Sequence, residues 1–562
     1  MKLSILSTVS ALALVAAAPA YAQSNTSAVT QSGSGQIAAV TQTGSINGSM
    51  VTQTGTNNEA DVTQSGTNAS SSVTQSGTNG SGDALRNNKV TVKQSGNSAA
   101  STVVQEPGVG VDNRNRVLVE QDGDNTSSVL QAGTANGAEV HQGGGSGNNS
   151  TIDQSGALNS IGDVVDDNAS AGVTQFGNNN GSSIDQNPAT RAVASVLQNG
   201  DANMSSIRQE TAAGSSAADA SHASVSQSGV SNESTINQLS GTNPSLLDAT
   251  VIQNGTDNLS SIDQSGAQNS AFVTQGGTNN NSSVTQTATA PGADAIVAQN
   301  GADNRSSVNQ SAAANSANVT QNANNSVSDV KQAGTANSAK LMQSGTNNDN
   351  FIDQRLYANN NSVDVTQGGT GNAARTVQVG QRVQATDATN NQVKLVQSGS
   401  NNFSGTSQEG SGNLADIKVS GAGVSVAGRQ TTGAGYRDNE PPETDVWQVS
   451  DNNKAFIDQA SDASRVTIYQ GLEQVTGGYE LAPGSNNDAN VTQTAAADNS
   501  RADVIQGGSN HTANVMQSGA DNDSYLNQMG TGNTATVSQL SYGNLSTIDQ
   551  SGTGNTATVT QN

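Results

Sequence analysis

Apolar and polar positions alternate along almost the whole chain, in short segments that return about every eleven residues. Residues 533–539 read Asn-Thr-Ala-Thr-Val-Ser-Gln, so Asn, Ala, Val and Gln are spaced by two. This is the period of a β-strand, whose side chains point to alternate faces. We therefore expect Asn, Ala, Val and Gln to lie inward and the residues between them outward. For one unit, this predicts a buried Val319 beside an outward Thr320.

A glycine two positions after the glutamine marks the end of each predicted strand, because glycine adopts the backbone conformations that a tight turn needs. Eleven residues thus make one strand and one turn, and two units make a strand-turn-strand rung of about 22 residues. The sequence predicts an all-β fold, a stacked β-solenoid of the cross-β, amyloid-like kind. The candidate turn residues are Gly33, Gly44, Gly55, Gly66, Gly77 and Gly552.

Stacking the rungs at about 4.7–4.9 Å places glutamine on glutamine and asparagine on asparagine. Each side-chain amide can then donate to one neighbour and accept from the other, and a buried amide without a partner costs about 1–3 kcal/mol. Ladders of this type would hold the rungs in register. The candidate ladder residues are Gln42, Asn47, Gln53, Asn58, Gln64, Gln310, Asn315, Gln321, Gln528, Asn533, Gln539, Asn544, Gln550, Asn555 and Gln561.

Insertions interrupt the repeat, and an even number of units separates one insertion from the next. If a rung has two strands, every insertion falls at the same one of its two turns and projects from one edge. Only the stretch from Gln470 to Gln493 does not fit this rule. The insertions lie in the intervals Gln75–Gln94, Gln105–Gln121, Gln154–Gln175, Gln186–Gln198, Gln209–Gln227, Gln238–Gln253, Gln286–Gln299, Gln354–Gln367 and Gln378–Gln397.

Four segments follow from these patterns. Residues 1–22 have a basic start, an apolar run and an Ala-x-Ala-like site, which is typical of a secretory signal peptide. Residues 23–420 and 448–562 are predicted solenoid. Residues 421–447 form an irregular Gly- and Pro-containing segment, interpreted as a long surface loop or, alternatively, as a break between two solenoid blocks or a contact site.

The units resemble the curlin repeat of curli, the bacterial functional amyloid, which is written Gln-x-Gly-x-x-Asn-x-Ala followed by Gln. The match is close at 42–64, 310–354 and 528–561. The resemblance implies export through an outer-membrane secretion protein, action of a nucleator protein, and assembly into fibres on the surface of a Gram-negative-type bacterium. The chain is several times longer than usual for the family and carries insertions, which leaves fibre subunit, nucleator and long adhesin as alternatives.

The amino-acid composition also limits the possible folds and partners. Only 32% of the residues are hydrophobic and 2% aromatic, too few for a conventional core in 562 residues, and there is no cysteine for disulfides. The net charge of −24 argues against nucleic acid or an anionic membrane as partner. After signal cleavage no segment approaches the roughly 20 apolar residues of a membrane span.

No motif for catalysis, cofactor or metal is found. His141, His222 and His511 are scattered, and we interpret them as isolated exposed residues. We therefore expect a secreted structural protein, not an enzyme, and with no cofactor: a curli-like amyloid fibre subunit for cell adhesion and biofilm matrix that associates with itself.

Two alternatives stay open. One is a long monomeric β-solenoid surface adhesin, and the other an ice-binding solenoid, suggested by the outward row Thr556, Thr558 and Thr560. The final repeat, 552–562, has no charge, proline or cap, and therefore favours end-to-end assembly.

Overall fold

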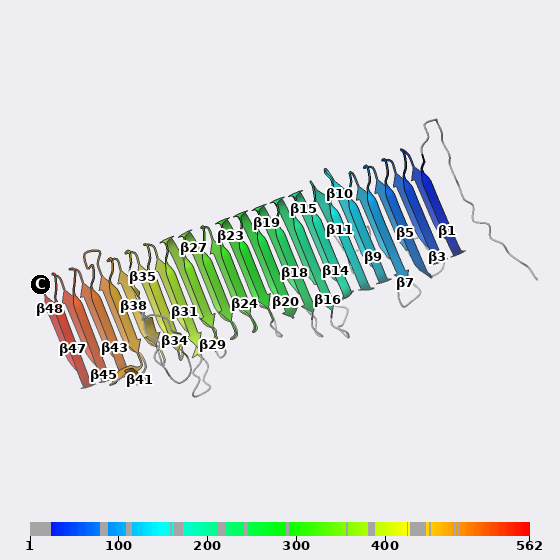
Figure 1. Ribbon diagram of the computed structural model, residues 1–562. Helices are drawn as coiled ribbons and strands as arrows, with labels where there is room; N and C mark the ends of the chain where they lie inside the picture. Colours follow the sequence, from blue (N-terminus) through cyan, green and yellow to red (C-terminus); the bar gives the residue numbers. More distant parts are fainter. Residues whose placement is uncertain are drawn as a thin grey trace, which may run out of the picture. The chain divides into compact units, whose positions relative to one another are not determined.

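Each strand of the repeat pairs in parallel with the equivalent strand of the next rung, so the chain coils into a β-solenoid of two facing parallel sheets (Figure 1). The computed structural model describes residues 24–78, 88–107, 115–157, 160–161, 172–211, 221–240, 246–287, 292–355, 358–379, 388–423, 425–426, 445–448, 451–475, 478–481 and 484–562. The predicted signal peptide, residues 1–22, lies outside these residues.

The chain divides into two compact units, Met1–Thr211 and Ala212–Asn562. In unit 1, sheet A contains β1 (Thr26–Ser34), β3 (Gly48–Thr56), β5 (Ser70–Thr78), β7 (Ala100–Pro107), β9 (Thr126–Thr134), β11 (Asn149–Ala157), β14 (Gly181–Thr190) and β16 (Met204–Thr211). Sheet B contains β2 (Ile37–Gln42), β4 (Glu59–Gln64), β6 (Lys89–Gln94), β8 (Arg116–Gln121), β10 (Gly137–Gly143), β12 (Ser160–Ile161), β13 (Val173–Phe176) and β15 (Val193–Asp201).

Unit 2 repeats this arrangement. Its sheet A contains β18 (Glu233–Ser240), β20 (Leu259–Gly266), β22 (Asn281–Gln286), β24 (Arg305–Gln310), β26 (Val327–Gln332), β28 (Asp349–Gln354), β31 (Ala373–Val379), β34 (Phe403–Glu409), β36 (Ser425–Val426), β37 (Asp445–Gln448), β39 (Arg465–Gln470), β43 (Arg501–Ser509), β45 (Asp523–Thr531) and β47 (Leu545–Thr553).

Sheet B of unit 2 contains β17 (His222–Val230), β19 (Asp248–Thr256), β21 (Ser270–Thr278), β23 (Asp294–Ala302), β25 (Ser316–Gln321), β27 (Ser338–Thr346), β30 (Ser362–Thr370), β33 (Gln392–Gln397), β35 (Leu414–Val419), β38 (Lys454–Gln459), β42 (Asp488–Gln493), β44 (Thr512–Gln517), β46 (Thr534–Gln539) and β48 (Thr556–Gln561). Two short pairs stand apart: β29 (Ala358–Asn359) with β32 (Ala388–Thr389), and β40 (Leu472–Val475) with β41 (Gly478–Leu481).

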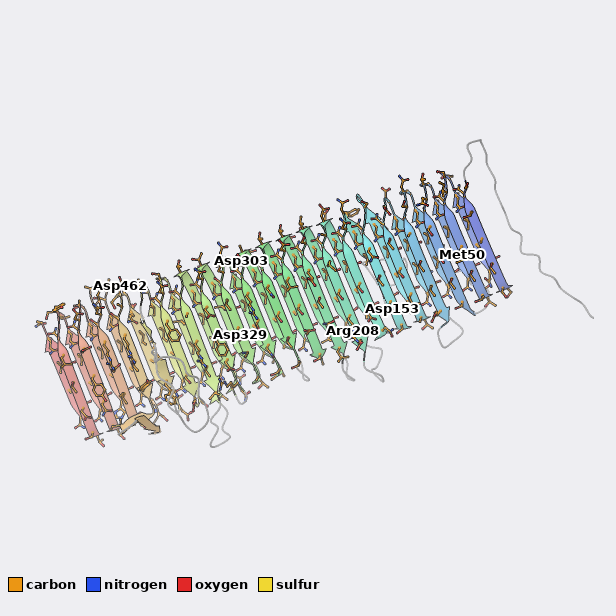
Figure 2. All side chains as sticks on the ribbon, viewed as in Figure 1. Met50, Asp153, Arg208, Asp303, Asp329 and Asp462 are labelled. Atoms are coloured by element: carbon orange, nitrogen blue, oxygen red, sulfur yellow. The ribbon has the colours of Figure 1, made fainter. Side chains whose placement is uncertain are left out.

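The register confirms the rung of about 22 residues. Where no insertion intervenes, equivalent residues pair at that separation, as Val51 does with Val73, and insertions raise the average to about 24 residues per turn. The inward face is also confirmed: Val319 is fully buried, whereas Thr320 is partly exposed. Outward side chains such as Met50, Asp153 and Asp329 come from the alternate positions (Figure 2).

The inward apolar positions differ between the two sheets, which the sequence pattern alone did not predict. Two residues before the inward Val, most sheet B strands carry Ala, as at Ala317, and a few carry Val, as at Val90. Sheet A usually carries Ser at this position, as at Ser260 and Ser282, and these serines are buried. The expectation of alanine is therefore correct for most of sheet B and wrong for most of sheet A.

Most insertions lie at one edge, in the connection from a sheet A strand to the next sheet B strand. In unit 1 they separate β5 from β6, β7 from β8, and β14 from β15. In unit 2 they separate β18 from β19, β22 from β23, β28 from β30, and β31 from β33, and the β40–β41 pair between Gln470 and Gln493 occupies the same connection. The Gln209–Gln227 insertion falls at the division between the units.

The Gln154–Gln175 insertion is an exception, because it separates β12 from β13 within a sheet B strand position. Residues 421–447 are also not a loop over their whole length, because strands lie near both of their ends. Both β36 and β37 pair with β34, so the segment begins and ends as part of sheet A. Residues 427–444 lie outside the part of the chain that the structure describes.

Candidate functional site

The stacked glutamines form hydrogen-bonded ladders on the inward faces of both sheets. Gln253 donates from Nε2 to Oε1 of Gln275 at 2.8 Å, and Gln275 donates in the same way to Gln299 at 2.8 Å. Nε2 of Gln275 also donates to the Leu259 carbonyl at 2.8 Å, which ties the sheet B strand β21 to the sheet A strand β20. Each glutamine therefore links its own rung to the next and one sheet to the other.

The predicted ladder residues take these positions. Those inside the stack are buried: Asn47, Gln53, Asn58, Gln64, Gln310, Asn315, Gln321, Gln528, Asn533, Gln539 and Gln550. Gln42, Asn544 and Gln561 are half-buried, and Asn555 is exposed. These last four lie on the first or last described rungs, where a neighbouring rung covers them on one side.

In the asparagine ladder the predicted bond between side-chain amides is present, and bonds to the backbone are added to it. The Asn280 backbone N–H donates to Oδ1 of Asn258 at 3.0 Å. Its Nδ2 donates to the carbonyls of Gly276 and Gly301 at 2.8 and 3.0 Å, and to Asn258 Oδ1 at 3.1 Å. Most of the bonding is thus from side chain to backbone. The short asparagine side chain closes its own turn and the turn of the next rung.

The turn glycines stack closely on one another. Gly33, Gly44, Gly55, Gly77 and Gly552 have positive φ, as the turn prediction requires, but Gly66 does not. A Cβ atom on Gly66 would lie 1.8 Å from the Gly96 carbonyl oxygen. At Gly66 the close approach of the backbones, and not a positive φ, therefore makes glycine necessary.

His511 occupies a position in the asparagine ladder, so its interpretation as an isolated exposed residue is wrong. Its side chain is buried, its backbone N–H donates to Asn487 Oδ1 at 3.0 Å, and its Nδ1 accepts the Asn533 N–H at 3.2 Å. Nε2 lies 3.0 Å from the Gly507 carbonyl and donates to it. These bonds suit the neutral ring, and burial lowers the pKa of His511 below its usual 6.5.

The first prediction concerns pH and His511. Because its pKa is lower in the folded state, its contribution to stability is present above about pH 6.5 and is lost as the pH falls below that value. The His511→Asn variant restores the ladder residue and should lose less stability between pH 7 and pH 5 than the wild type. Denaturant midpoints of both proteins at the two pH values test this, and equal losses would contradict it.

Val419 interrupts the glutamine ladder of sheet B in unit 2. It is buried at the position that Gln397 and Gln459 occupy in the neighbouring strands. Gln397 Nε2 instead donates to Ser404 Oγ at 3.0 Å, and Gln459 Oε1 is buried without a hydrogen-bond partner. An unpaired buried acceptor of this kind costs about 1–3 kcal/mol.

The second prediction follows from this interruption. Val419→Gln supplies a donor to Gln459 and an acceptor to Gln397, and should raise the free energy of unfolding by about 1–2 kcal/mol. Ile417→Gln, on the same strand and inward but outside the ladder, should lower it. Urea titration of both variants is the measurement. A Val419→Gln protein that is less stable than the wild type would show that the ladder does not determine this position.

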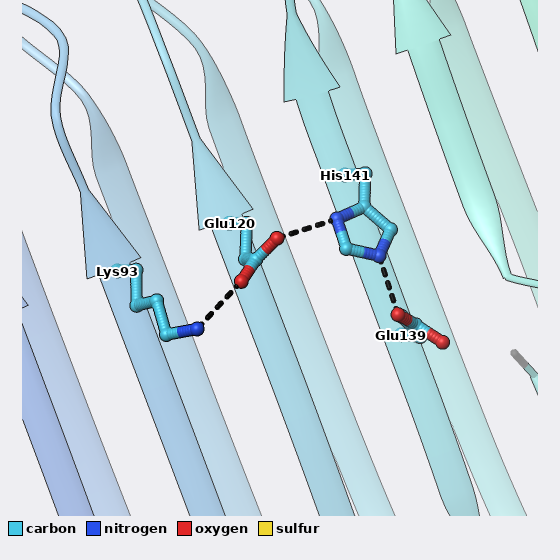
Figure 3. A network of polar contacts seen from close by, with 4 residues as sticks. All are labelled: Lys93, Glu120, Glu139 and His141. Carbon is cyan, nitrogen blue, oxygen red and sulfur yellow. Dashed lines mark hydrogen bonds and ion pairs between the residues drawn. The ribbon is translucent and has the colours of Figure 1, made fainter. Parts of the chain in front are cut away.

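Charged side chains form a network on the outward face of sheet B in unit 1 (Figure 3). Lys93 Nζ lies 2.8 Å from Glu120 Oε1, Glu120 Oε2 lies 3.0 Å from His141 Nδ1, and His141 Nε2 contacts Glu139. Hydrogen bonding to Lys93 lowers the pKa of Glu120. Such exposed pairs contribute little to stability but favour one register of neighbouring strands. His222, the third histidine, points outward from β17.

A small apolar cluster lies on the outward face of sheet A in unit 2. Tyr469 and Ile505 are buried there although they stand at outward positions, and Trp447, Tyr525 and Met529 pack against them. The Trp447 and Tyr469 rings meet edge to face at a centroid distance of 6.3 Å. The antiparallel pair β40–β41 follows Tyr469 directly and contacts β43. The irregular segment of the sequence therefore ends at a second, local core.

Within the residues that the structure describes, no three His, Asp or Glu side chains are grouped so as to hold a metal ion. The same residues include no helix that is long and apolar enough to cross a membrane.

Comparison with known protein families identifies the same repeat that forms the ladders. The model of the curlin associated repeat matches residues 47–77, 247–275, 255–287, 388–418 and 530–562. No curated protein matches the chain. The matches lie in both units, and each includes ladder glutamines and turn residues. Both units of the chain therefore contain curlin associated repeats.

Proposed function

We propose that the protein is an extracellular structural protein, a curli-like amyloid fibre subunit used for cell adhesion and biofilm matrix. The observation that carries this proposal is the stack of in-register glutamines, in which Gln253 donates to Gln275 and Gln275 donates to Gln299. Among the described strands β48 pairs only with β46, and Val559 is half-buried whereas Val537, one rung earlier, is 1% exposed. An uncovered strand edge of this kind is a template for another chain.

The two ends of the ladder are chemically complementary. Where two ladder glutamines are stacked, the earlier one donates to the one in the following rung, as Gln31 does to Gln53 and Gln539 does to Gln561. The rung of β1 and β2 therefore offers glutamine acceptors, and the rung of β47 and β48 offers donors. A second copy can continue the ladder in the same direction, with no change in register.

The role that we propose is structural, without catalysis, cofactor or metal. Export through an outer-membrane secretion protein and nucleation by a second curlin-repeat protein, on a Gram-negative-type cell, belong to the same proposal and rest on the family resemblance. The alternative, a long monomeric adhesin, would use the outward β40–β41 pair and its apolar cluster for contact.

Purified protein from residue 23 onward distinguishes the two functions. The fibre proposal predicts filaments in electron microscopy, binding of an amyloid dye, and a diffraction spacing of about 4.7–4.8 Å. Protein that stays monomeric and binds no dye over days at high concentration would contradict the fibre role and favour the adhesin.

The third prediction concerns the last rung. Val559→Lys places an ammonium group in the stacking face, where burial without a partner costs several kcal/mol, and growth at that end should fall by more than about a hundredfold. Thr558→Lys, on the same strand but outward, should grow at nearly the wild-type rate. Seeded elongation followed by dye binding compares them, and equal rates for both variants would contradict docking at β48.

A further inference from the structure

The outward face of sheet A in unit 1 has no charged side chain over its first five strands, between the ladder asparagine and the ladder glutamine. Its middle row reads Ala28, Met50, Ser72, Thr102 and Ser128, and the two flanking rows contain only Thr, Ser, Gly, Ala, Val and Leu. These side chains are exposed or half-exposed. Charged residues lie at the border: Asp124 precedes β9, Glu106 lies at the end of β7, and Asp153 and Asp185 lie further along the sheet.

The opposite face of the same rungs is very different. Sheet B carries outward ion pairs there, between Lys89 and Glu59 at 3.0 Å and between Lys93 and Glu120 at 2.8 Å. Burying that face against another molecule would require desolvation of these charges, which is costly. The chain as a whole has a net charge of −24, so two copies repel each other where their charged faces meet.

We propose that the charge-free face of β1, β3, β5, β7 and β9 packs against the same face of a second copy, so that two filaments associate side by side. This inference rests on the proposed fibre and adds a lateral contact to its end-to-end contact. Short side chains on a flat, in-register sheet can interdigitate with an identical sheet in a dry interface. No charge is buried when they do so.

The area of the charge-free face is large enough for contact with a second copy. Five strands spaced about 4.8 Å apart, with six residues of about 3.3 Å each, span about 24 by 20 Å. The contact then buries about 1,000 Å² over both partners, which is near the lower limit for a specific interface. Because each copy along a filament repeats the contact, paired filaments gain many such areas at once.

Matched lysine variants of the full chain test the pairing. Ser72→Lys with Ser128→Lys places two charges on the face, on β5 and β9. Ala39→Lys with Thr91→Lys places two on the opposite face, on β2 and β6. In both pairs one strand of the same sheet separates the substituted strands. The net charge changes equally, so only the face differs.

Mass per unit length of filaments, measured by electron microscopy, is the readout. Wild type and the sheet B variant should form paired filaments, and the sheet A variant single filaments of half that mass per length, with elongation unchanged. Single wild-type filaments, or a sheet A variant that stays paired, would overturn the inference while leaving the fibre intact. If no protein forms filaments, the proposed fibre fails, and sedimentation decides the pairing: a monomeric wild type overturns it, and a dimer lost only in the sheet A variant supports it.

Discussion

Replacing Gln275 with leucine is expected to lower the free energy of unfolding by about 2–6 kcal/mol, although leucine is apolar and the site is fully buried. The reason is the ladder. Leucine removes the acceptor of Gln253 and the donor to Gln299, so two buried amides each lose a partner at about 1–3 kcal/mol. Denaturant unfolding of the purified variant measures the loss.

Thr274→Leu is the matched control for this fourth prediction. It introduces the same side chain on the same strand, at the neighbouring position that points outward. Its effect should stay below about 0.5 kcal/mol, as for most surface substitutions. If both substitutions lower the free energy of unfolding equally, or if Gln275→Leu raises it, the ladder contributes no specific stability and burial alone explains the fold.

Gly277→Ala should lower the free energy of unfolding by a similar amount, about 2–5 kcal/mol. Gly277 has a φ of +90°, a conformation that alanine rarely adopts, and its added Cβ would lie 2.1 Å from the Gly301 carbonyl oxygen in the next rung. Neither backbone can move without displacing the ladder above it. The loss is again measured by denaturant unfolding.

The adjacent glycine provides the control for this fifth prediction. Gly276 does not have a positive φ, and the only close atom to a Cβ there would be Asn300 Oδ1, at 2.9 Å, which belongs to a side chain that can rotate away. Gly276→Ala should therefore cost less than about 1 kcal/mol. Equal losses at the two positions would show that the turn tolerates side chains and that its stacked glycines are not required.

Much of the fold follows from local periodicity. A spacing of two within each unit determines which side chains point inward, and a spacing of eleven between units determines which glutamines can stack. Val319 and Gln321 are buried for this reason, and Gln321 donates to Gln343 at 2.8 Å. The burial of Val319 and the stacking of Gln321 both follow from spacings along the sequence alone.

Other features depend on contacts that periodicity does not contain. The asparagine bonds involve the backbone of the next rung, whose position relative to Oδ1 is known only in three dimensions. His511 can replace asparagine because its Nδ1 reaches the Asn533 N–H, and the sequence does not distinguish this histidine from His141 and His222, which point outward. The burial of Tyr469 at an outward position depends on Ile505 and Trp447 in neighbouring rungs. Each of these features is a contact between rungs.

Spin labels test the two-strand rung most directly, because the chain has no cysteine of its own. Residues 274 and 298 are paired one rung apart on the outward face of sheet B, whereas residues 274 and 285 lie on strands β21 and β22 of opposite sheets. Cysteine pairs at these positions, spin-labelled and diluted with unlabelled protein, show which pair of residues is stacked. A rung of two strands predicts strong spin–spin broadening for 274 with 298, at about 5 Å, and none for 274 with 285. Broadening of the second pair and none of the first would contradict a rung of two strands.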